Sequence, residues 1–117
     1  MNARRPHGSG DWLLQRLSAL LLLPLGLWFS YSLVTRVDLS RGGWLAFVAA
    51  PWHAGALIVF LLAVLLHSEL GVQVVIEDYV ARGPRERTLR VASQIVHFVA
   101  AVIGAFAILH IAMRAGA

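Results

Sequence analysis

A long apolar segment that begins near Ala54 has a histidine close to its middle and ends on an acid–phenol pair, Asp78 and Tyr79. Ionisable side chains are costly inside hydrocarbon, and those that occur there generally mark function. His67 and Asp78 are eleven residues apart, roughly three helical turns, and Gly71 lies on the same stripe one turn after His67. A helix over this segment therefore has an imidazole, a gap and a carboxylate on one face. The carboxylate lies about 16 Å along the helix axis from the imidazole.

The composition requires lipid rather than water around most of the chain. Its 117 residues are 59% hydrophobic and 14% charged, with a mean hydropathy of +0.74. A soluble domain of this size needs a more polar surface. We expect an all-α integral membrane protein, a three-helix transmembrane bundle in one domain over residues 1–117. The chain has no cysteine, which excludes disulfides, iron–sulfur clusters and thiolate metal sites on it.

Three membrane spans are predicted, at about residues 11–35, 51–80 and 86–113. Pro24 falls inside the first span, where membrane helices tolerate a breaker that neighbouring groups satisfy, and we expect a kink there. The connector over residues 36–51 is rich in turn residues, and we expect a short surface helix over 44–50. The second span exceeds the ~20 residues needed to cross, so it is tilted or projects from the bilayer.

The distribution of arginine predicts the orientation of the spans. Arginines gather at the head (Arg4, Arg5 and Arg16) and in the second connector and its flank (Arg82, Arg85, Arg87 and Arg90), with fewer elsewhere (Arg36, Arg41 and Arg114). The positive-inside rule then places the N-terminus and the end bearing Tyr79 in the cytoplasm. With no transit peptide apparent, we expect a multi-pass protein of a bacterial inner (plasma) membrane. The net charge of +4 is explained by this topology better than by nucleic-acid binding.

Two interpretations of His67 are open from the residues alone. It is an axial haem ligand through a neutral imidazole, or it forms a helix–helix hydrogen bond. Gly71 would let a porphyrin edge approach the helix, or would serve close helix packing. His97 in the third span lies about 6 Å from the depth of His67, so a haem held by both histidines of this chain is also open.

Asp78 and Tyr79 are either interfacial residues or part of a quinone site. Tyrosine prefers the depth of the membrane interface, and an acid at a helix end can be solvated. A quinone carbonyl, in turn, needs a hydrogen-bond donor in a dry pocket, which a phenol provides, and a nearby carboxylate can assist protonation.

A second stripe on the same segment, Glu69, Gln73 and Glu77, is roughly opposite His67. A carboxylate in lipid is neutral or paired, so structural pairing is the favoured role of this stripe. Arg16 is a candidate partner for Glu77 or for a haem propionate. Glu69 lies deeper, and we expect its partner on another chain.

The pattern His67-x3-Gly71-x6-Asp78-Tyr79 resembles the signature of the hydrophobic membrane anchor, or D subunit, of succinate dehydrogenase (complex II). The segment Asp11–Ser18 is similar to that family's opening of the first span. Size, three spans and a cytoplasmic head agree with the family, so the resemblance covers nearly the whole chain.

The resemblance implies a function. In that family the histidine matching His67 is one axial ligand of haem b, and the other comes from the cytochrome b556 (C) subunit. The tyrosine matching Tyr79 contacts ubiquinone, with the acid matching Asp78 beside it. The flavoprotein and iron–sulfur subunits dock on the cytoplasmic face and deliver electrons from succinate to the quinone. Such a chain links the tricarboxylic acid cycle to electron transport without being catalytic on its own.

Two alternatives from other classes are retained. One is a small b-type cytochrome that uses His67 and His97 together as haem ligands. The other is a haem-free membrane assembly subunit, for which the polar residues in the spans would serve helix packing only.

Overall fold

The computed structural model describes residues 9–35 and 38–115, and its regular structure there is entirely α-helical. The helices are α1 (Ser9–Thr35), α2 (Arg41–Ala49), α3 (Pro51–Tyr79) and α4 (Pro84–Ala115). The predicted all-α class is therefore confirmed. Arg4, Arg5 and Arg36, which entered the prediction of orientation, lie outside the described residues.

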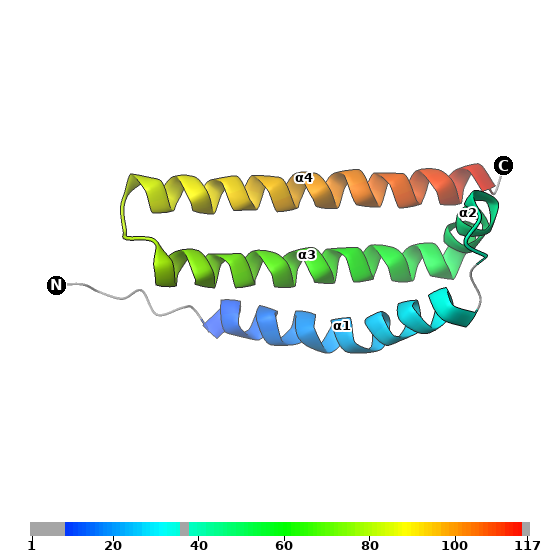
Figure 1. Ribbon diagram of the computed structural model, residues 1–117, viewed down its shortest axis with the longest axis horizontal. Helices are drawn as coiled ribbons and strands as arrows, with labels where there is room; N and C mark the ends of the chain where they lie inside the picture. The colour runs from blue at the N-terminus through cyan, green and yellow to red at the C-terminus, as the bar shows by residue number, and fades with distance from the viewer. Residues whose placement is uncertain (1–8, 36–37, 116–117) are drawn as a thin grey trace.

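The long helices lie side by side, with α3 between α1 and α4 (Figure 1). Helix α3 packs against both neighbours, whereas the backbones of α1 and α4 do not approach each other closely within the described ranges. The short helix α2 crosses one end and contacts α3 and α4. Because each side of α3 meets a different helix, polar residues on α3 sort into two separate interfaces.

Helices α1, α3 and α4 are each long and apolar enough to cross a membrane, with hydropathies of 1.8, 2.1 and 2.3 over their most apolar windows. The 29 residues of α3 extend about 43 Å, which exceeds the ~30 Å hydrocarbon core. Helix α4 has no buried residue. Large apolar side chains on the outer helices, such as Leu27 of α1 and Phe106 of α4, are about 69% exposed. These surfaces need lipid or other subunits around them, as in a multi-pass membrane protein.

Helix α1 continues through Pro24 without interruption and is bowed rather than sharply kinked (Figure 1). Proline removes one backbone donor and pushes away the preceding turn, which bends a helix that packing holds together.

The short helix predicted in the first connector is confirmed as α2, although it begins earlier than expected, at Arg41. Ser40 caps it by accepting a hydrogen bond from the Gly43 N–H at 3.1 Å. The backbone N–H and hydroxyl of Ser40 in turn donate to the Asp38 carboxylate, which lowers the pKa of Asp38. A Cβ on Gly43 would collide with the Asp38 carbonyl, so this cap requires glycine.

An aromatic cluster joins the far ends of α1, α2 and α3. The His53 ring lies 4.3 Å from the Phe47 ring and 5.6 Å from the Trp28 ring, measured between centroids. The His53 Nδ1–H donates to the Phe47 carbonyl at 2.8 Å. Interfacial aromatics therefore hold α2 against α3 at the end opposite to Tyr79.

Small residues allow the helices to approach closely. Ser18 and Ser32 on α1 and Ala54 and Ala63 on α3 are buried. A Cβ on Gly104 of α4 would meet the Leu61 side chain of α3, so Gly104 serves close packing of these two helices.

The start of α1 and the α3–α4 connector lie at the same end of the layer (Figure 1). The connector turns at Gly83, whose φ of 155° is rarely adopted by residues with a side chain. Most described arginines gather at this end: Arg16, Arg82, Arg85, Arg87 and Arg90.

Candidate functional site

His67 lies on the side of α3 that faces α1. Its Nδ1 is 3.2 Å from the Ser18 hydroxyl oxygen, and that hydroxyl also donates to the Gln15 carbonyl at 2.9 Å. Ser18 is only 3% exposed, so this contact is shielded by the two helices. No hydrogen bond joins Nε2 of His67 to any residue that the structure describes, and that atom is not among the buried ones. One ring nitrogen is thus held inside the chain, while the other is available at its surface.

Gly71 leaves open space one turn after His67. A Cβ built at Gly71 finds nothing within 4 Å. Close packing within this chain therefore does not explain Gly71, whereas it does explain Gly104. The helix surface beside His67 is free to receive a group from outside the chain.

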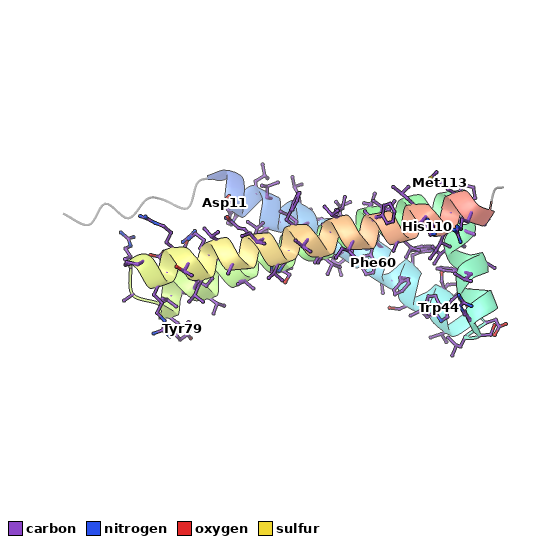
Figure 2. The ribbon with its side chains drawn as sticks, turned by 90° about the horizontal axis from the view of Figure 1, so that it is seen from above. Asp11, Trp44, Phe60, Tyr79, His110 and Met113 are labelled. Atoms are coloured by element: carbon purple, nitrogen blue, oxygen red, sulfur yellow. The ribbon has the colours of Figure 1, made fainter. Side chains whose placement is uncertain are left out.

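Tyr79 ends α3 and is 85% exposed. It borders an open hollow of about 310 Å³, whose other lining residues come from the connector and the start of α4: Val80, Ala81, Arg82, Gly83, Pro84 and Arg85. Figure 2 places Tyr79 at one end of the molecule, with His110 and Met113 at the other. Asp78 is also exposed, but it does not line the hollow.

Arg16 lies near the start of α1, where its guanidinium is 5.1 Å from the centroid of the Trp12 ring. This cation–π contact keeps a positive charge at the same end of the layer as Tyr79. Of the two candidate partners of Arg16, Glu77 instead binds Arg90 at 2.7 Å.

A polar network fills the other side of α3, between α3 and α4. Glu69 accepts hydrogen bonds from Gln73 and from the Ser93 hydroxyl, and its Oε2 is 2.9 Å from Nδ1 of His97. Nearer the end of the layer, Arg90 bridges Glu77 and Glu86. The predicted structural pairing of the Glu69, Gln73 and Glu77 stripe is confirmed.

This network changes one expectation, the partner of Glu69, and disfavours one open alternative, the shared ligation by His67 and His97. Glu69 has its partners in this chain, on α4, and the expectation of a partner on another chain is wrong. His97 uses both ring nitrogens: Nδ1 donates to the Ser93 carbonyl at 2.8 Å, and Nε2 is 3.1 Å from the Ser68 hydroxyl. With both nitrogens engaged and a different interface around it, His97 is not placed to bind a metal together with His67.

Replacing Glu69 by alanine is expected to destabilise the protein. The side chains of Glu69 and His97 are 15% and 18% exposed, so Gln73 and Ser93 would lose this acceptor where water is scarce. Each unsatisfied buried group costs about 1–3 kcal/mol, although hydrogen bonds in membrane bundles average nearer ~0.6 kcal/mol. Thermal unfolding of the purified complex should show a lower midpoint for Glu69→Ala than for Glu69→Gln, which keeps an acceptor oxygen. Equal midpoints for Glu69→Ala and the unsubstituted protein would contradict this role.

Ser18 is the site residue that the sequence interpretation did not single out. A serine in an apolar run does not by itself indicate a site. Its distance from His67 along the chain does not indicate that the two side chains meet. One hint existed, since position 18 falls in the segment Asp11–Ser18 that shows the family resemblance.

Comparisons with known proteins agree with this architecture. The model of a family described as "Succinate dehydrogenase/Fumarate reductase transmembrane subunit" matches residues 2–113. A succinate dehydrogenase hydrophobic membrane anchor subunit of Rickettsia bellii is 33% identical over 101 residues, covering 81% of this chain and 81% of the relative. The subunit of the same name from Rickettsia felis is 33% identical over 101 residues, covering 86% of this chain and 82% of the relative. The chain therefore belongs to the succinate dehydrogenase/fumarate reductase transmembrane subunit family, as a hydrophobic membrane anchor.

Proposed function

We propose that this anchor supplies one axial ligand of haem b through His67 and part of a ubiquinone-binding site through Tyr79 and Asp78. The observation that carries the proposal is the state of the His67 ring. Its Nδ1 is held by Ser18 inside the chain, while Nε2 has no hydrogen bond to a described residue. The second axial ligand would come from the partner anchor, the cytochrome b (C) subunit.

The residues around His67 fit a haem. Neutral imidazole is a common axial ligand, and a ligating histidine usually donates its other N–H to an oxygen acceptor. The open space at Gly71 leaves room for a flat macrocycle against the helix. The described residues contain no group of three or more metal-binding side chains, and a haem site needs only one from this chain. When bound, haem b supplies a one-electron redox centre within the membrane.

Arg16 is a candidate partner for a haem propionate. Its charge lies on α1 at the end of the layer nearest the head, two residues before Ser18, and its guanidinium contacts only an aromatic ring among the described residues. A carboxylate at that depth needs a cation, which Arg16 is able to provide.

The hollow at the end of α3 fits the head group of a quinone. Its volume of about 310 Å³ is at the lower end of ligand pockets, which span about 300–1,000 Å³. The Tyr79 hydroxyl would donate a hydrogen bond to a quinone carbonyl, and the cations of Arg82 and Arg85 would stabilise negative charge on its oxygens. Asp78, one residue earlier, would assist proton uptake from the aqueous side.

The partners follow from this arrangement. The flavoprotein and iron–sulfur subunits would dock on the arginine-rich end, from which electrons reach the quinone beside Tyr79. The C subunit would cover part of the apolar surface that the single chain leaves exposed on α1 and α4. In this assembly the soluble subunits oxidise succinate, while the anchor binds, positions and protonates the quinone.

The test is co-purification of the complex followed by an optical spectrum. The expected result is the reduced spectrum of a low-spin b-type haem together with succinate-dependent reduction of a ubiquinone analogue. A purified complex that shows neither haem absorbance nor quinone-dependent activity would overturn the proposal in favour of a haem-free subunit.

The proposed orientation, with the N-terminus and the Tyr79 end in the cytoplasm of a bacterial inner membrane, has a direct test because the chain has no cysteine. Leu39→Cys and Ala81→Cys place single thiols in the two connectors, both at exposed positions. An impermeant thiol reagent should label Leu39→Cys in intact cells. It should label Ala81→Cys only after the membrane is opened and the complex denatured. The reverse pattern would contradict this orientation.

A further inference from the structure

We propose that Ser18 is a positioning residue that fixes the tautomer of His67, with the ring hydrogen on Nδ1 and the free electron pair on Nε2. The inference rests on the proposed haem ligation and adds to it the residue that prepares the ligand. It begins from the two hydrogen bonds at the Ser18 hydroxyl.

A serine hydroxyl has one hydrogen to donate and lone pairs to accept with. The Gln15 carbonyl, 2.9 Å away, is an acceptor only, so the hydroxyl hydrogen is used there. The contact of 3.2 Å to Nδ1 of His67 can then be a hydrogen bond only if Nδ1 carries the hydrogen and donates it. In a neutral imidazole the other nitrogen is then unprotonated. Nε2 is therefore the metal-binding atom.

The burial of Ser18 strengthens the preference of His67 for the tautomer with its hydrogen on Nδ1. Ser18 is 3% exposed, and it lies on a helix face packed against α3, so water does not compete for Nδ1. Gln15 precedes Ser18 by one turn on the same helix, so the acceptor that orients the hydroxyl is part of the backbone. While the hydroxyl donates to Gln15, tautomer exchange of His67 would set two lone pairs against each other in this shielded contact.

Nδ1 of His97 and Nδ1 of His67 lie near different oxygen atoms. His97 faces the carboxylate of Glu69, whereas His67 faces a neutral hydroxyl. A carboxylate draws the ring hydrogen strongly and makes the imidazole a more basic ligand, while a hydroxyl does so weakly. Ser18 therefore fixes the orientation of the His67 ring while raising the basicity of its Nε2 only modestly. Without an acceptor, Nε2 would donate less electron density and the ferric state of a bound haem would be less stable.

The experiment uses the whole purified complex with substitutions at position 18. Ser18→Ala removes the acceptor, Ser18→Cys replaces it by a weaker one, and Ser18→Thr keeps the hydroxyl. The matched control is Ser32→Ala, the same change at a buried serine of α1 that is 2% exposed and has no hydrogen bond to a described histidine. Haem content and the haem reduction potential are measured, neither of which depends on turnover.

We expect the reduction potential to rise in the order Ser18, Ser18→Cys, Ser18→Ala, and haem retention to fall by about tenfold in Ser18→Ala, as for other lost partners of metal-binding histidines. Ser18→Thr and Ser32→Ala should match the unsubstituted complex. If Ser18→Ala does not assemble, the potential of Ser18→Cys decides. An unchanged potential in any assembled variant that lacks the hydroxyl overturns the inference. An unsubstituted complex without haem overturns the proposed function instead, so the two failures are distinguishable.

Discussion

A complex bearing His67→Leu is expected to lose its low-spin haem absorbance, while one bearing His97→Gln retains it. Leucine has no electron pair to offer the iron, so this chain would no longer supply a ligand to the haem. Glutamine at position 97 keeps a hydrogen-bonding side chain next to Glu69, so the α3–α4 interface is preserved. The optical spectrum of the reduced, purified complexes is the measurement, normalised to the content of the soluble subunits.

This pair of variants distinguishes two hypotheses, an anchor that supplies one haem ligand and a small b-type cytochrome that supplies both. If both haem ligands came from this chain, His97→Gln would abolish the spectrum as completely as His67→Leu. The engagement of both His97 nitrogens argues for the first outcome. An unaltered spectrum in His67→Leu would refute the ligand assignment.

Tyr79→Phe is expected to reduce the rate of quinone reduction about tenfold while leaving succinate oxidation by artificial dyes largely intact. One hydrogen bond is worth up to ~1.5 kcal/mol, and about 1.4 kcal/mol corresponds to tenfold in rate. Dyes would accept electrons directly from the soluble subunits, so that activity would not require the quinone site at Tyr79. The comparison is between succinate–quinone and succinate–dye activities of the same preparation.

Tyr31→Phe is the matched control for this prediction. It removes the same atom from the chain's other tyrosine, near the far end of α1, and should change neither activity. Equal loss of both activities in Tyr79→Phe would indicate a general defect in assembly. Full quinone activity without the phenol would contradict the assignment of Tyr79.

The positions of the helices along the chain were predictable from the local sequence. The apolar runs are long enough to cross a membrane as helices, and the structure has helices there. Their boundaries are marked by Asp11, by the turn residues 38–43 and by Arg82–Pro84. The stripe containing His67 and Gly71 was predictable for the same reason, because the helical repeat alone determines which residues share a face.

Which helix each face meets was not predictable, because helix pairing depends on shape and on polar contacts between distant residues. In lipid, apolar surfaces do not distinguish one neighbouring helix from another. The wrong partner expected for Glu69, and the partner of Glu77 that was left open, both reflect this limit. Ser93, His97 and Arg90 are 24, 28 and 13 residues from their α3 partners.

The sequence by itself therefore determined the membrane environment, the helices and the position of His67 halfway along the middle span. These depend on hydropathy and helical periodicity, which are local properties. Only the tertiary structure decided that α3 lies between α1 and α4, that His97 is engaged with Glu69, and that Ser18 holds the ring of His67. Those outcomes depend on which donor meets which acceptor across a helix interface, and such contacts exist only once the helices have packed.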